Sequence, residues 1–276
     1  MKTIYKSIVT IALALITSTA SYASILIDGL YYEFFDETSE AMVVKDEKSN
    51  NIEPSYTAST INILEEVTYN NKTYKVTVIG ADAFQLNKNL TSISIPETVR
   101  SIGASAFSGC KKLKSITLPS GITKIERSVF AACQSLKSVT IPEGVTIISE
   151  SAFGNCSSLE SVAIPSSVTF ISPKAFSLCS SLKSIIVKSP TPIDLFNDTF
   201  DTFGKLYVPE GSKDAYSQSP IWKNFTIIEG TETTGITNVP TSITQHLTPV
   251  FDLSGHSLTA PRKGVNIING KKVVIK

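Results

Sequence analysis

Apolar residues recur along this chain every 23 residues, most clearly in a column of phenylalanines. The members of this column are Phe84, Phe107, Phe130, Phe153 and Phe176. Other apolar positions keep the same interval through five successive units, which together span residues 79–189. A fixed period of about 20 to 29 residues is typical of solenoids, in which each unit buries its apolar face only by stacking on its neighbours.

Each unit predicts one strand that stops sharply. In the second unit, residues 113–118 contain the alternation of apolar and polar side chains that is typical of a strand. A proline follows this segment in four units, where a residue without a backbone N–H ends a ladder and leaves no amide unpaired. The β-branched stretch after the proline predicts a second short strand, and we expect little helix. We therefore predict a mainly β repeat solenoid with 23-residue units and stacked parallel strands.

Segments on both sides of the repeats break the period and predict caps, because a bare terminal coil would expose apolar surface and an unpaired strand edge. Residues 24–78 contain strand-like runs at 30–34 and 72–78, which predict an N-terminal β cap. Residues 190–229 end in several large aromatic residues, among them Trp222, and predict a C-terminal capping unit.

The last part of the chain differs in composition from the repeats. Residues 230–243 are rich in threonine and have little apolar periodicity, so we interpret them as a linker. Residues 244–276 contain three short strand-like runs separated by glycine or Asn-Gly turns. This segment is too short to build a stable core alone, and we predict a small β tail.

The first 23 residues have the layout of a secretory signal peptide. Lys2 and Lys6 precede an apolar run at residues 8–16. Ser21 and Ala23 then place small residues at the −3 and −1 sites of a cleavage after Ala23. The apolar run is too short to span a bilayer, and we expect no transmembrane segment in the mature chain. We predict that the mature chain is secreted or faces outward on the cell surface.

Four cysteines occupy one column of the repeat, and their spacing argues against disulfides. They are Cys110, Cys133, Cys156 and Cys179. Neighbouring members would stack with parallel Cα–Cβ bonds, a geometry that cannot form a disulfide unless the backbone moves. Because free cysteine is among the most buried residue types, we predict four buried free thiols. Such a row also cannot surround a metal ion tetrahedrally.

Neither motifs nor composition indicate catalysis. The two histidines, His246 and His256, lie in the tail, so the repeats offer no Ser-His or Cys-His pair. The carboxylates that could pair as acid and base occupy variable repeat positions, which is typical of a solvated face; they are Asp82, Glu126, Glu150 and Glu160. A net charge of +1 argues against nucleic acid as a partner, since that would require a basic face. We predict no enzyme, no cofactor and no metal site.

The outward positions of the expected strands form the candidate interaction surface. Two columns of small, uncharged side chains include Ser115, Thr117, Ser138, Thr140 and Ser161. These hydroxyls suit close packing in a parallel ladder, but a flat hydroxyl array would also suit a glycan or a partner strand. Toward the C-terminus, Ile147, Phe170 and Ile186 stand where earlier repeats have polar residues. We expect these three to form one apolar patch unless the C-terminal cap or the tail covers them.

The pattern IGxxAFxxCxxLxxIxIPxxVxx, nearly intact from Ile102, Ile125 and Ile148, closely resembles the BspA-like class of leucine-rich repeats of bacterial surface proteins. The resemblance covers residues 79–189 and implies a leucine-rich-repeat solenoid that serves as a secreted or surface-exposed binding module. Adhesion to host or neighbouring-cell proteins has been proposed for some members. The last residues, ending in Lys272 to Lys276, are similar to the sorting tails of type IX secretion cargo but shorter, and a β appendage packed on the solenoid is the alternative.

Two hypotheses for function follow. The first is a secreted or cell-surface recognition module that mediates protein–protein interaction or adhesion, with a partner protein on a host or neighbouring cell. The second is a glycan-binding or envelope scaffold protein that stays on its own cell. Aromatic platforms for sugar stacking are missing from the repeat faces apart from Phe170, and this favours the first hypothesis.

Overall fold

The computed structural model describes residues 24–46 and 55–230, together with four strands between residues 250 and 275. Residues 1–230 and residues 231–276 are two separate compact units. The expected signal peptide, and the linker from residue 231 onward, lie outside the described residues. Among the helices that are described, none combines the length and the apolar character that a membrane crossing requires.

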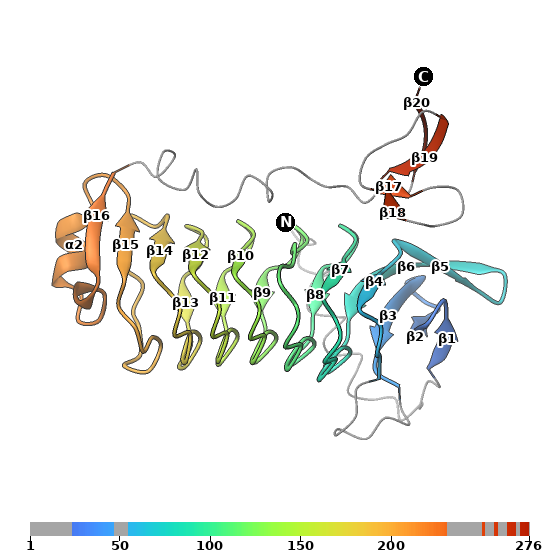
Figure 1. The fold of residues 1–276 in the computed structure, drawn as a ribbon, viewed down its shortest axis with the longest axis horizontal. Coiled ribbons are helices and arrows are strands. Elements are labelled where there is room, and N and C mark those ends of the chain that lie inside the picture. Colours follow the sequence, from blue (N-terminus) through green and yellow to red (C-terminus); the bar gives the residue numbers. More distant parts are fainter. Residues whose placement is uncertain are drawn as a thin grey trace, which may run out of the picture. The chain divides into compact units, whose positions relative to one another are not determined.

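Two parallel sheets run along the compact unit of residues 1–230, whose coils stand side by side in one row (Figure 1). The strands of the long sheet are, in spatial order, β10 (Ser138–Thr140), β12 (Ser161–Ile164), β14 (Ser184–Val187), β15 (Lys205–Val208) and β16 (Thr226–Glu229). Those of the short sheet are β9 (Lys124–Ile125), β11 (Ile147–Ile148) and β13 (Phe170–Ile171). The strand pairs in both sheets are parallel and join equivalent residues of successive units. The predicted solenoid of stacked parallel strands is confirmed.

The second coil departs from the predicted regularity. Its segment 113–118 lies between β7 (Ser92–Ser94) and β10 but is not a strand. The amide N of Lys114 lies 3.5 Å from the carbonyl O of Thr91, whereas the equivalent bond from Glu160 to Lys137 is 2.9 Å. On its other side β7 pairs with β4 (Thr60–Asn62). The stacking therefore begins one strand earlier than the repeat pattern indicates.

The N-terminal cap is a mixed sheet that continues into the solenoid. Its strands are β1 (Ile25–Ile27), β2 (Leu30–Phe35), β3 (Glu40–Val44), β5 (Glu66–Tyr69) and β6 (Lys72–Ile79), in the order β1-β2-β3-β6-β5. A two-residue turn with left-handed backbone at Asn70 and Asn71 joins β5 to β6, and asparagine tolerates that conformation well. Strand β6 also pairs with β8 (Ser101–Ile102), which belongs to the repeats, so cap and coils share hydrogen bonds.

The C-terminal cap contains a short helix, α2 (Lys213–Gln218), and a 3-10 turn, η1 (Trp222–Asn224). Buried aromatic side chains tie this cap to the last repeat, since the Trp222 Nε1–H donates to the Ile193 carbonyl at 2.8 Å. Similarly, the Tyr216 hydroxyl donates to the Ser189 carbonyl at 2.9 Å. The polar ends of these large side chains are thereby satisfied inside the protein, as buried tyrosine and tryptophan require.

The C-terminal unit is an antiparallel sheet in the order β18-β17-β19-β20. Its strands are β17 (Val250–Phe251), β18 (Ser257–Leu258), β19 (Gly264–Ile268) and β20 (Lys271–Ile275). The sequence predicted three strand-like runs, and the additional strand is β18.

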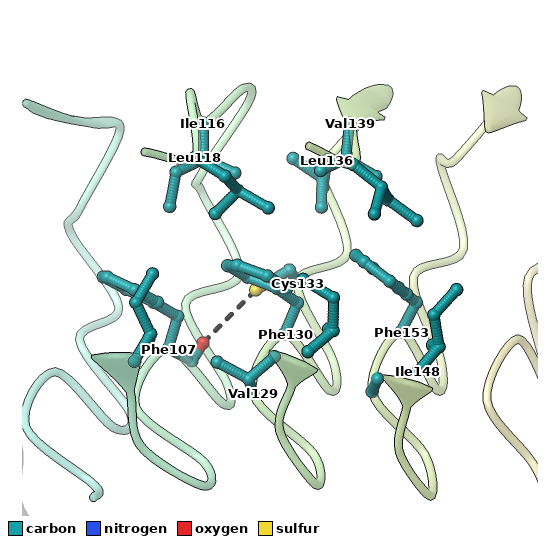
Figure 2. Packing of buried hydrophobic residues seen from close by; sticks show 14 of the residues in the cluster. Phe107, Ile116, Leu118, Val129, Phe130, Cys133, Leu136, Val139, Ile148 and Phe153 are labelled. Carbon is teal, nitrogen blue, oxygen red and sulfur yellow. Dashed lines mark hydrogen bonds between the residues drawn. The ribbon is translucent and has the colours of Figure 1, made fainter. Parts of the chain in front are cut away.

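The core of the solenoid is a continuous stack of aromatic rings. Successive rings of the phenylalanine column lie parallel, with centroids 5.3, 5.6, 5.4 and 5.2 Å apart. Figure 2 shows three of them, Phe107, Phe130 and Phe153, in adjacent coils. Tyr56 extends the stack at the N-terminal end and Phe200 at the C-terminal end. Each coil is therefore buried against copies of itself, as the 23-residue period predicts.

Candidate interaction surface

The long sheet presents two columns of side chains outward, because alternate residues of each strand point away from the core. The first column consists of Ser138, Ser161, Ser184, Lys205 and Thr226. The second column consists of Thr140, Ala163, Ile186, Tyr207 and Ile228. The second column changes from a hydroxyl to apolar side chains along the solenoid. We call its members Ala163, Ile186, Tyr207 and Ile228 the apolar row.

The polar residues proposed from the sequence lie at the surface. Thr140, Ser138 and Ser161 are in the long sheet, where Ser138 and Ser161 are half-buried neighbours and Thr140 is exposed. Ser115 and Thr117 are exposed but belong to the irregular second coil, outside any strand. The serine column is therefore part of a sheet only from β10 onward.

The three apolar residues proposed as one patch are divided between the two sheets. Ile147 and Phe170 are paired neighbours in the short sheet, whereas Ile186 lies in the long sheet. The prediction of one patch was wrong, because the turn that follows the proline places the two strands of a coil in different sheets. Ile186 belongs instead to the apolar row.

Phe170 is partly covered by a residue that the sequence analysis missed. Its ring packs edge to face against Phe196, with centroids 6.0 Å apart, and the two residues remain 44% and 41% exposed. Phe196 lies in the terminal coil, where the 23-residue period is lost, so no column marked it. Tyr207 had a detectable signal, since Leu206 to Pro209 repeats the strand and proline of the earlier units.

The cysteine column is internal and has a structural role. All four thiols are buried and free, and each donates to the carbonyl O of the phenylalanine one coil earlier, as Cys133 does to Phe107 at 3.2 Å (Figure 2). Burial raises the pKa of Cys110 and of Cys179 to about 12. In the first 23-residue repeat, Asn87 holds the position that cysteine holds in the others. Its Nδ2 donates to the Ala58 carbonyl at 3.1 Å. The column therefore satisfies backbone carbonyls and keeps the thiols protonated.

The described residues contain no cluster of three or more histidine, cysteine or acidic side chains that could hold a metal ion. The carboxylates weighed as acid–base candidates are on the surface, and two of them form ion pairs with lysines. Glu126 pairs with Lys124 at 2.9 Å and Glu160 with Lys183 at 3.3 Å.

Comparisons with known proteins agree with the coil geometry. Residues 77–202 match the model of the BspA type leucine rich repeat region in six copies, one more than the sequence pattern gave. No curated protein matches the chain.

Two solved structures share the fold. A leucine-rich repeat protein from Bacteroides ovatus is 29% identical with a TM-score of 0.53, over 67% of this chain and 49% of its own, so this chain spans about half of that protein. The leucine-rich repeat protein of T. pallidum is 24% identical with a TM-score of 0.52, over 67% of this chain and 86% of its own. The compact unit within residues 1–230 is therefore a mainly β leucine-rich-repeat solenoid, and its residues 77–202 carry repeats that match the BspA type.

Proposed function

We propose that this chain is a secreted or surface-exposed recognition module that binds another protein through the apolar row of the long sheet. One observation carries the proposal. A face with a hydroxyl at Thr140 becomes apolar across four adjacent strands, from Ala163 to Ile228. Apolar side chains that cluster at the solvent boundary with a polar rim mark interaction surfaces. Leucine-rich repeats are generally protein-interaction modules, which agrees with this use of the sheet.

The composition of the row suits a protein partner. Tyr207 lies between Ile186 and Ile228 in the ladder, and tyrosine is enriched among the residues that dominate binding energy at interfaces. The neighbouring column supplies the polar rim, with Ser184 beside Ser161 on one side and Lys205 on the other. A flat sheet with a central aromatic residue and a hydrogen-bonding rim has the arrangement expected of an interface core.

A substitution that restores hydroxyls to the row tests the proposal. The double variant Ile186→Thr/Tyr207→Thr continues the threonine that Thr140 already places in this column. We expect this variant to bind a protein partner at least about thirtyfold more weakly, because loss of central anchors commonly costs about 2 kcal/mol or more. Both side chains are half-buried, so the melting temperature should also fall, and affinities are compared at a temperature where circular dichroism shows the variant folded. The matched control is Leu26→Thr/Leu64→Thr, two exposed leucines of the N-terminal cap region.

The partner would first be captured from host-surface and same-cell envelope fractions on the immobilised mature chain and then purified. Dissociation constants for the original chain and both variants decide the outcome. Equal affinity for the row variant and the original chain would exclude the row, and weaker binding by Phe170→Ala alone would move the site to the short sheet. Capture of a neutral glycan in place of a protein would favour the glycan-binding alternative.

Export and anchoring are part of the proposal and are tested separately. The expected cleavage after Ala23 predicts that the exported protein begins at Ser24, which N-terminal sequencing would check. If residues 244–276 are a sorting tail, their deletion should release the protein from the cell surface or block its export. Unchanged surface attachment would identify the tail as a structural appendage.

A further inference from the structure

Five exposed lysines lie shortly before the strand segments of the first three coils. They are Lys88, Lys111, Lys112, Lys114 and Lys137. We call this group the lysine edge. Lys114 and Lys137 are neighbours, because the Lys137 amide donates to the Lys114 carbonyl at 3.2 Å. Lys112 Nζ reaches Asn89 Oδ1 of the previous coil at 3.5 Å, so this part of the edge is also in register.

The lysines of the edge form no ion pair within the described part of the chain. Each ion pair identified in the described part of the chain involves other residues, and none includes a lysine of the edge. The column of Lys114 and Lys137 continues in the next coil with Glu160, which pairs with Lys183 at 3.3 Å. Like charges directly opposite in a ladder are destabilising. Lys114 therefore lies opposite Lys137 in the ladder without an ion pair of its own among the described residues, and this points to an anion from outside.

We propose that the lysine edge binds an anionic polysaccharide through its carboxylate or sulfate groups. Successive coils are about 4.8 Å apart, so the edge offers a row of ammonium groups that a flexible linear polyanion can follow. The surrounding side chains are small and polar, as at Asn89, Thr91 and Ser115, and can hydrogen-bond sugar hydroxyls.

The edge does not suit single-stranded nucleic acid, which requires aromatic side chains for base stacking. The exposed large hydrophobic residues among the described positions lie elsewhere; they are Leu26, Leu64, Phe170, Leu178, Phe196 and Phe203. Binding at the edge is separate from the proposed protein contact, since the apolar row begins at Ala163 in later coils.

Heparin serves as the probe polyanion and neutral dextran as its control. The full mature chain should bind immobilised heparin at low salt, and added salt should weaken binding because it screens the ammonium groups. The variant Lys111→Gln/Lys112→Gln/Lys114→Gln should bind about tenfold more weakly or worse. The control Lys174→Gln/Lys213→Gln/Lys223→Gln removes the same charge from exposed lysines elsewhere and should stay within about twofold of the original chain.

Three results would overturn the proposal. The first is absence of heparin binding by the original chain, and the second is an equal loss in both triple variants, which would indicate net charge alone. The third is tighter binding of a DNA duplex than of heparin through the same lysines. Circular dichroism confirms that the variants fold, and the affinity of the apolar row for its protein partner should be unchanged in both triple variants.

Discussion

Replacing Phe130 with alanine tests whether the stacked rings stabilise the solenoid as the structure indicates. The Phe130 ring lies between Phe107 and Phe153, with centroids 5.6 and 5.4 Å away, and the residue is 1% exposed. Removing a buried phenylalanine side chain costs about 3–5 kcal/mol when the site cannot collapse. Collapse is restricted here, because the rings on both sides are held by their own coils. We therefore expect a loss near the upper part of that range.

A loss of about 4 kcal/mol corresponds to a melting temperature lower by about 8–16 °C for a folded unit of this size. Chemical denaturation followed by circular dichroism measures the loss over all coils. Fluorescence of the single tryptophan, Trp222, reports the C-terminal cap separately. Both signals should shift together if the coils unfold cooperatively, since each repeat is stabilised by its neighbours.

The matched control is Phe170→Ala, which removes the same atoms from a ring that is 44% exposed. That variant should lose about 1 kcal/mol or less. A double-mutant cycle then isolates the ring contact. Phe130→Leu and Phe153→Leu should couple by about 0.5–1.5 kcal/mol, whereas Phe84→Leu and Phe153→Leu, which share no ring partner, should be additive. Equal losses for Phe130→Ala and Phe170→Ala, or coupling between the rings that do not touch, would refute the reasoning.

Two further predictions concern the cysteine column and the coil turns. Because burial raises the pKa of Cys110 and Cys179 from 9.0 to about 12, a thiol reagent should label none of the four cysteines in the native chain at pH 9 and all four after denaturation. The stability that these protonated thiols contribute is complete below pH 9 and should decline toward pH 12, so a denaturation midpoint that stays constant over this range would contradict the burial. Leu178→Asn should raise stability by about 0.5–1 kcal/mol in the same assay, because Leu178 is exposed with φ 57° and the equivalent Asn155 suits its φ of 59°.

The inward columns could be predicted from the sequence because each buried position must fit a copy of itself in the next coil. That requirement repeats the residue type at Phe130 and Cys133 and makes both columns visible as a period. The cap aromatics were predicted only as a group. The partners of Tyr216 and Trp222 are backbone carbonyls in the chain before them, and such pairings leave no periodic signal.

The candidate surface was only partly predictable, for a related physical reason. Outward positions have no self-packing requirement, so the residue type can change from Thr140 to Ile186 without disturbing the ladder. Departure from the repeat was the available signal, and it identified Ile186 and Phe170. It could not show that a tight turn separates their sheets, nor that Phe196 of the irregular terminal coil packs against Phe170.

The two proposed surfaces lie on coils that differ in how they balance charge and apolar exposure. The early coils carry the lysine edge beside exposed hydroxyls such as Ser115, whereas the later coils pair Glu160 with Lys183 and present the half-buried Ile186 and Tyr207 outward. Because the stacked core is the same beneath both, a change on one surface need not alter the shape of the other. A solenoid of this kind can therefore hold a polyanion and a protein at once, and saturating heparin should leave the affinity of the apolar row unchanged. A mutual reduction in affinity would instead show that the two ligands overlap on one face, since binding linkage is reciprocal.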